Sequence, residues 1–298
     1  MTNYIDLHMH TNYSDDGSYT PSQIVEMCHE AKVKIMAIAD HNTVKGVEEG
    51  MNKAKELGMS YIPAIEIDCT YKNTINLHVL GYGIDYTNPA FNALGENIYK
   101  QERSLAIEKL KKTNELFHVH LTEEQLLKIM PNGVFTGEAF GEALLNDPAY
   151  HDAEFLKPYR EGGARSNNPY VNFYWDFYSQ GKPIYVEVKY PTLEETIKLI
   201  KENGGIPVLA HPGNNLKGQF EVFDDMVKLG IEGVEAFSSY HTKETCEYFY
   251  NKAKEYDLLY TCGSDFHGKT KPSIFLGENN CFIDPSEIEE KLKAYHLI

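Results

Sequence analysis

The stretch Ile35-Met36-Ala37-Ile38-Ala39-Asp40-His41 carries the pattern that decides the fold, because a short apolar run ends directly on two polar residues. A run of this length fits a buried strand better than a helix. It lies between two segments with amphipathic helical periodicity, residues 20–32 and 44–57. The first of these opens on Thr20-Pro21, a typical N-cap followed by a typical first helical residue. The stretch therefore predicts a strand between two helices, as in an α/β fold.

The same unit recurs along the chain. Further strands are predicted at residues 5–7, 61–65, 77–82, 206–210, 233–237 and 259–261, and further helices at 193–203, 220–229 and 243–256. Strands that alternate with helices at this spacing predict a parallel sheet, most simply a β/α barrel of the TIM type. Residues 86–182 differ, being rich in Glu, Lys, Asn, Tyr and Phe and mostly helical in pattern. We therefore expect a barrel formed by residues 1–85 and 183–298, with residues 86–182 inserted as a helical cap over a ligand.

The charge, the apolar runs and the cysteine spacing of the sequence limit the kinds of partner and the cellular location that we expect. The net charge of −16 argues against a long nucleic acid or an anionic membrane as partner, although bound divalent cations can reverse the local sign. No apolar run reaches the roughly 20 residues that a membrane span needs, and the first residues lack the pattern of a secretion signal. The 5 cysteines are widely spaced, without a Cys-x-x-Cys pair, which favours reduced thiols. We expect a cytoplasmic protein.

Residues that can bind metal recur at the predicted strand ends. They are His8, His10, Asp40, His41, Glu66, His78, His211, Asp265 and His267. Any one of them alone is more often a structural residue, but in a β/α barrel the carboxyl ends of the strands converge on one mouth. The two rings of a His-x-His pair lie on one side of a strand. Histidine and carboxylate ligands without thiolates suit Zn, Mn or Fe, so the pattern predicts a metal centre.

The motifs around these residues resemble those of the PHP (polymerase and histidinol phosphatase) family, in the same order. They are Asp6-Leu7-His8-Met9-His10-Thr11 with Ser14-Asp15-Asp16-Gly17, then Asp40-His41-Asn42-Thr43, Glu66, His78-Val79-Leu80-Gly81, Ala210-His211-Pro212-Gly213 and Gly263-Ser264-Asp265-Phe266-His267. The resemblance covers residues 1–85 and about 183–270 and implies a distorted (β/α)7 barrel. It also implies two or three divalent metal ions in the site.

The resemblance implies a distribution of ligands over three ions. The first would be held by His8, His10, Glu66 and Asp265, the second by a bridging Glu66 with His78 and His211, and the third by His41, His267 and an acidic residue of the loop after His10. That loop is one residue longer than is usual in the family, so either Asp15 or Asp16 could supply the carboxylate, and Asp16 is slightly preferred. Asp40 is expected to support a ligand rather than to bind metal.

Clustered divalent ions favour hydrolysis of a phosphoester through attack by metal-bound hydroxide. The departing alkoxide would be stabilised by the third ion or by a protonated histidine such as His241. The chain has neither a Gly-x-Ser-x-Gly elbow nor a phosphate-binding P-loop, so acyl-enzyme chemistry and nucleotide-triphosphate motor chemistry are disfavoured. The sequence predicts a metal-dependent phosphoesterase.

The resemblance is strongest to stand-alone members that act on small phosphomonoesters. It implies a nucleoside monophosphate, a 3′,5′-bisphosphate or a short oligonucleotide as substrate. Gly137 stands where this branch often has a phosphate-binding arginine, and Arg165 or Arg160 could replace it or could be surface charges. The aromatic residues of the insertion could stack on a base or form its core; they are Tyr170, Phe173, Tyr174 and Trp175.

Two alternatives remain open from the sequence. One is a histidinol-phosphate phosphatase, against which the Asp15-Asp16 loop counts. The other is a non-catalytic metal-binding PHP module, which would be expected to lack several of the ligands. Every expected ligand position is occupied here.

Overall fold

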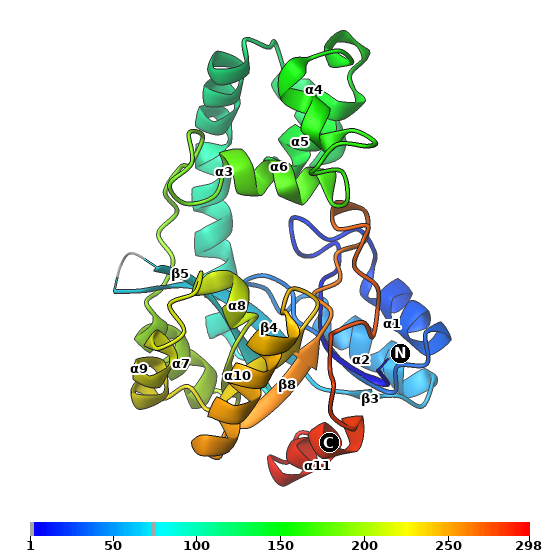
Figure 1. Ribbon diagram of the computed structural model, residues 1–298, viewed down its shortest axis with the longest axis vertical. Helices are drawn as coiled ribbons and strands as arrows, with labels where there is room; N and C mark the ends of the chain where they lie inside the picture. The colour runs from blue at the N-terminus through cyan, green and yellow to red at the C-terminus, as the bar shows by residue number, and fades with distance from the viewer. Residues whose placement is uncertain (1–2, 73–74) are drawn as a thin grey trace.

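The computed structural model describes residues 3–72 and 75–298 and has an α/β architecture (Figure 1). The strands are β1 (Ile5–Met9), β2 (Ile35–Ile38), β3 (Ser60–Tyr61), β4 (Ala64–Tyr71), β5 (Ile75–Tyr82), β6 (Ile206–Leu209), β7 (Gly233–Ser238) and β8 (Leu259–Gly263). The helices that accompany them are α1 (Pro21–Glu30), α2 (Val47–Glu56), α7 (Leu193–Glu202), α8 (Pro212–Asn215), α9 (Val222–Leu229), α10 (Lys243–Glu255) and α11 (Pro285–Ala294), with the short η3 (Gly268–Thr270). The predicted α/β class is confirmed.

The strands form two sheets. β1, β2 and β3 are parallel, and the second sheet has the order β4-β5-β6-β7-β8. Isolated parallel bridges, Met9 with Phe266 and His41 with Glu66, link the two sheets at both ends of the strand order. Among residues 3–72 and 75–298, however, the hydrogen-bonded strands do not close into one barrel. The metal-competent strand ends all lie near these bridges.

Strand β5 corrects the prediction of an all-parallel sheet. It runs antiparallel to both β4 and β6, whereas β6, β7 and β8 are parallel to one another. Because β4 ends at Tyr71 and β5 begins at Ile75, the connection is too short for a parallel crossover, which needs a dozen or more residues. The two strands are therefore a hairpin, with Asp68 paired directly with His78.

Local signals place the helices as predicted. Thr20 caps α1 with a reciprocal capping box, in which its hydroxyl accepts the Gln23 amide and the Gln23 side chain accepts the Thr20 amide. Thr192 and Glu195 repeat this arrangement at the start of α7. The apolar faces of these helices pack on the strands, which are almost wholly buried. No described helix combines the length and the apolar character that a membrane span requires.

The segment between β5 and α7 is mostly helical, and we refer to its helices as the cap. Its elements are α3 (Pro89–Phe117), α4 (Glu123–Ile129), α5 (Gly137–Asn146), η1 (Pro148–Tyr150), η2 (Glu154–Tyr159) and α6 (Pro169–Phe177). The long α3 runs from the strands into the cap, and α6 crosses the cap on the side that faces them (Figure 1). The cap has its own apolar core, in which Phe117 stacks on Phe155 with ring centroids 4.4 Å apart and Phe173 is fully buried.

Candidate metal centre

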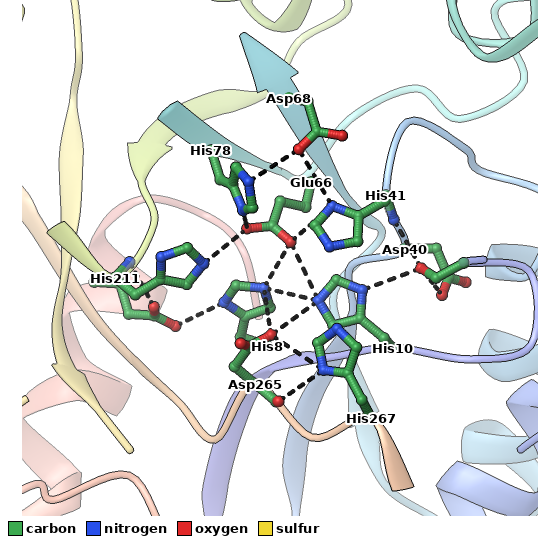
Figure 2. Close-up of polar contacts among 12 residues, drawn as sticks. His8, His10, Asp40, His41, Glu66, Asp68, His78, His211, Asp265 and His267 are labelled. Atoms are coloured by element: carbon green, nitrogen blue, oxygen red, sulfur yellow. Dashed lines mark hydrogen bonds and ion pairs between the residues drawn. The ribbon is translucent and has the colours of Figure 1, made fainter. Parts of the chain in front are cut away.

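Glu66 lies at the middle of the site (Figure 2). Its Oε2 is 3.1 Å from Nε2 of His8 on β1 and 3.2 Å from Nε2 of His10, which directly follows β1. Its Oε1 is 3.0 Å from Nδ1 of His78 on β5 and 3.1 Å from Nε2 of His211, which follows β6. Oε2 is also 3.3 Å from Nδ1 of His41, so one oxygen of this fully buried carboxylate faces three imidazole rings and the other faces two. This is the position expected of a bridging ligand.

Four of the predicted ligands are spaced as they would be around one ion. Nε2 of His8 and Nε2 of His10 are 3.1 Å apart, and Oδ1 of Asp265 is 3.1 Å from Nε2 of His10 and 3.5 Å from Nε2 of His8. Tetrahedral bonds of about 2.0–2.1 Å separate neighbouring ligand atoms by about 3.4 Å. The structure therefore brings His8, His10, Glu66 and Asp265 together with the spacing of a single metal site.

A second group forms around His267. The ligand atoms of His10, Asp16, His41 and His267 all lie within 4.8 Å of one another, and Oδ2 of Asp16 is 3.0 Å from Nε2 of His267. Asp15 faces the cap instead and accepts a hydrogen bond of 2.8 Å from the Asn132 amide. The structure thus places Asp16, and not Asp15, among the potential ligands.

Sequence reasoning missed Asp68. Its Oδ1 is 3.0 Å from Nε2 of His78 and 3.6 Å from Nδ1 of His41, and Asn42 hydrogen-bonds its other oxygen. These three residues form a further group that could hold a cation. Glu66-x-Asp68 has the same spacing as His8-x-His10, and this repeat was the available signal.

The donor set fits divalent cations. Although Oε2 of Glu66 lies close to several imidazole nitrogens, it accepts no hydrogen bond from the residues that the structure describes, and among these residues Oδ1 of Asp16 and Nδ1 of His211 are also buried without a hydrogen-bond partner. Burial and the neighbouring His267 and His41 rings lower the pKa of His10 to about 4, which keeps it in the neutral form that binds metal. Burial opposes ionisation of Glu66, but the surrounding histidines outweigh it and hold its pKa well below its usual range.

Two buried carboxylates lie next to the candidate ligands on the side away from the cluster and can fix their orientation. Glu235 on β7 places Oε1 3.0 Å from Nδ1 of His8, and its Oε2 accepts the His211 backbone amide at 2.8 Å. Asp40 accepts the Ser14 hydroxyl at 2.9 Å, and that hydroxyl lies 3.1 Å from Nδ1 of His10. Asp40 therefore lies in the supporting position proposed for it. Glu235 was missed, although an acidic residue inside the apolar strand Gly233–Ser238 signals a buried role.

The backbone of two cluster residues is strained. His211 has a φ of 23° and Asp265 a φ of 58°, in the left-handed region that non-glycine residues rarely adopt. The Asp265 amide donates to the His8 carbonyl at 2.8 Å, so the strain at Asp265 is held by a bond to β1. Such strain is common where side chains must be aimed at a site.

The structure does not bring His241 or Arg165 to the cluster. Nδ1 of His241 is 3.0 Å from the Ala236 carbonyl, and its Nε2 accepts the Gly213 amide at 3.0 Å. Burial lowers the pKa of His241, so the ring is neutral and holds the turn after His211 rather than donating a proton. Arg165 forms a bidentate ion pair with Asp176 inside the cap, at 2.9 and 3.0 Å.

Lys271 and Tyr240, which the sequence analysis overlooked, lie beside the cluster. Nζ of Lys271 is 2.7 Å from Oδ2 of Asp265 and 3.4 Å from Nε2 of His267. The Tyr240 hydroxyl donates to the same Asp265 oxygen at 2.6 Å. Burial opposes the charge on Lys271, but Asp265 more than compensates and keeps its pKa raised. A fixed positive charge therefore adjoins the candidate metal ligands.

A cavity of about 740 Å³ separates the cluster from the cap. Asp16, His41, Asp68, His78 and Lys271 line it on the strand side. The opposite wall comes from α3, the start of α5, α6 and residues 185–190. A small molecule in this cavity would touch both the candidate ligands and the cap.

Comparison with known proteins agrees with this geometry. Over 90% of its length the chain is 28% identical to a 5′-3′ exoribonuclease of Haemophilus influenzae, of which it covers 91%. A 3′,5′-nucleoside bisphosphate phosphatase of Chromobacterium violaceum is 26% identical over 88% of the chain and 87% of its own length. A phosphoribosyl 1,2-cyclic phosphate 1,2-diphosphodiesterase of Eggerthella lenta is 26% identical over 89% of the chain and 94% of its own length.

Solved structures share the fold. A protein of Bifidobacterium adolescentis, described as a candidate metal-dependent phosphoesterase, superposes with a TM-score of 0.77 at 26% identity, over 97% of this chain and 95% of that one. The curated relatives named above are all enzymes that cleave phosphoric esters, so the predicted enzyme class is confirmed. The PHP domain family model matches residues 6–182, more than half of the 298 residues. The chain belongs to the PHP domain family.

Proposed function

We propose that this protein is a metal-dependent phosphoesterase that releases phosphate from small nucleotides or short oligonucleotides, with two or three divalent ions at the cluster. The observation that carries the proposal is Glu66, whose two buried oxygens face separate groups of histidines, and two of these histidines, His41 and His78, line the cavity below the cap. The activities of the relatives, which include a bisphosphate phosphatase and exoribonucleases, support nucleotides as the substrate class. The imidazole and carboxylate donors suit Zn, Mn or Fe.

The contacts of Glu66 and Asp265 with His10 support the ligand distribution that the family resemblance implies, although the tightest geometric group around His8, Glu66 and Asp265 contains His211 in place of His10. His8, His10, Glu66 and Asp265 would hold one ion, and Glu66 with His78 and His211 a second. Asp16, His41 and His267 would hold a third, and Asp68 would contribute between His41 and His78. We also propose that the two linked sheets act as one distorted (β/α)7 barrel, in which residues 1–85 and 183–298 form the catalytic unit and residues 86–182 its cap.

The chain's own residues would prepare the reaction. Bound divalent ions would lower the pKa of a water molecule and polarise the phosphate oxygens. Glu235 would keep His8 in one tautomer and orientation, as carboxylates commonly do for metal-binding histidines. Lys271 would place a positive charge at the cavity wall beside the phosphate, and the cap would limit the access of bulk water.

The test combines metal analysis with a phosphate-release screen. The purified protein, reconstituted separately with Zn, Mn and Fe, would be offered nucleoside monophosphates, 3′,5′-bisphosphates, dinucleotides and histidinol phosphate. We expect at least two equivalents of bound metal and release from the nucleotides, with a loss of at least about 100-fold in Asp265→Asn. Asp257→Asn is the matched control, because Asp257 is exposed and pairs only with Lys291 on the surface.

Each alternative has its own outcome in this screen. Release confined to histidinol phosphate would replace the nucleotide proposal. Full metal binding without release from any substrate would identify a non-catalytic module. Undiminished phosphate release by Asp265→Asn would rule out the proposed centre.

A further inference from the structure

Helix α6 divides its aromatic residues between two environments. Phe173 and Phe177 pack within the cap core, where Phe117 meets the Phe177 ring at 4.8 Å between centroids. The cavity above the cluster is lined by Val171, Tyr174 and Trp175 of α6 and by Tyr178, which directly follows the helix. Tyr174 and Tyr178 also pack against the cap core. Tyr170 lies outside the cavity wall and interacts with Asn146. The aromatic residues of α6 are therefore not all core, since two of them face the ligand space with their rings 5.3 Å apart.

Gly137 explains how the Tyr174 ring reaches this position. A Cβ atom at residue 137 would lie 2.9 Å from Cδ2 of Tyr174 and 2.8 Å from Cγ of Tyr178. Contacts this short would force the rings to move, so no side chain fits there without rebuilding the wall. Gly137 is the position at which the family resemblance places a phosphate-binding arginine. In this chain aromatic rings fill the space that such a side chain would need.

Positive charge is scarce on the cap side of the cavity. Among the described residues no arginine lines it; Arg165 is paired with Asp176, and Arg160 donates to carbonyls of the cap. Lys109 lines the cavity but is paired with the half-buried Glu102. The remaining lysines of the lining other than Lys271 are Lys45 and Lys217, both exposed. The cap wall offers planar apolar surface rather than a second anion site.

We propose that Tyr174 and Trp175 form a nucleobase subsite, so that the cap recognises the base of the substrate while the cluster holds its single scissile phosphate. This inference rests on the proposed function for the phosphate half of the substrate. Stacking of a base on an aromatic side chain is worth about 5- to 150-fold in affinity and tolerates different bases, because every base has a flat π face. The preferred substrate class is then a nucleoside monophosphate or the terminal nucleotide of a short oligonucleotide.

Trp175 provides a direct readout, because it is the only tryptophan of the chain. Its fluorescence would be titrated in the metal-loaded protein with adenosine, which carries a base but no phosphate, and separately with ribose 5-phosphate, which carries a phosphate but no base. We expect adenosine to quench the emission and ribose 5-phosphate to leave it nearly unchanged. Tyr174→Ala should weaken the adenosine response at least fivefold, Tyr174→Phe should retain it, and Tyr170→Ala on the same helix is the matched control.

Kinetics give a second, independent measurement. We expect kcat/KM for adenosine monophosphate to exceed that for ribose 5-phosphate by at least tenfold, and Trp175→Ala to lower only the former. The kcat/KM for a 3′,5′-bisphosphate should exceed that for the monophosphate by less than about threefold. The base subsite would be overturned if adenosine failed to quench the Trp175 emission. It would also be overturned if kcat/KM were clearly higher for the bisphosphate than for the monophosphate and Tyr174→Ala left that difference unchanged. If the wild-type protein bound adenosine but released no phosphate from any substrate, the proposed function would be refuted instead.

Discussion

The Asn132 side chain of the cap donates a hydrogen bond of 2.8 Å to Asp15, the residue next to Asp16 of the candidate metal centre. The Asn132 carbonyl in turn accepts the Tyr99 hydroxyl at 2.9 Å and a bond from Arg103, both on α3. The loop that carries Asp16 is thus tied to the cap through Asp15. The two neighbouring acidic residues of this loop therefore differ in their contacts, because Asp16 faces the cluster and Asp15 faces the cap.

This division predicts different effects of two conservative substitutions. Asp16→Asn should bind about one equivalent of metal less than the wild type, because the His10–His41–His267 group loses its carboxylate. Asp15→Asn should keep its full metal content, since an asparagine oxygen can still accept the Asn132 bond. Metal content would be measured by elemental analysis after reconstitution and desalting. The reverse result would show that Asp15 is the ligand.

Glu235→Gln should weaken metal binding about 10- to 100-fold while the protein stays folded, because His8 and the His211 amide lose a buried carboxylate partner. Competition with a chromophoric chelator would measure the affinity. Glu232→Gln is the matched control, since Glu232 is partly exposed and pairs with Lys201 at the surface. Equal affinities in the two variants would contradict the role of Glu235.

Metal removal should lower the thermal stability of the protein. The cluster buries several carboxylates and imidazoles whose ligand atoms face one another, as at His8 and His10. A metal at 100 times its dissociation constant adds about 2.7 kcal/mol to the stability of the state that binds it. Calorimetry before and after chelation would measure the shift. Asp265→Asn should show a smaller shift than the wild type, and an unchanged Tm after complete chelation would argue against a folded-state metal centre.

Glu138 should make the stability of the metal-free protein dependent on pH. Burial, followed by the nearby Asp16, raises the pKa of this cavity-lining carboxyl to about 7 from its ordinary 4.5. A pKa raised in the folded state gives stability that is present below the unfolded value and is lost as the pH rises through the folded value. The Tm of Glu138→Gln should therefore increase relative to that of the wild type as the pH rises from 4.5 to 7. Above pH 7 the difference in Tm should stay constant. A difference in Tm that is independent of pH would contradict this assignment.

Much of the site was predictable because its residues lie within or just after apolar strands. Apolar runs such as Ile35–Ile38 fix the strands, and the polar residues that follow them must then gather at one edge. Asp68 escaped this reasoning because the strand was predicted to end at residue 65, whereas β4 continues to Tyr71. The direction of β5 was also missed, although the short connection after Tyr71 excludes a crossover.

Other features depended on contacts that no local pattern encodes. Lys271 reaches Asp265 from a segment without regular periodicity, and Glu235 approaches His8 from a strand 227 residues away in sequence. His241 looked available as a proton donor because its two backbone partners are not visible in a sequence. The sequence predicted a helical cap over a ligand but left open whether its aromatic residues are core or binding surface, because the face of α6 that meets the cavity depends on how α3, α5 and α6 pack together.

The pairing of β4 with β5 links the folding of the chain to its chemistry. Asp68 lies directly opposite His78, and Glu66 lies two residues away on the same face. A slip of one residue in this hairpin would turn His78 to the opposite face and separate it from both carboxylates. A cation bound between these side chains can exist only in the native alignment. Metal binding would therefore stabilise the native strand register over registers shifted by one residue, so the ions would favour correct hairpin alignment during folding.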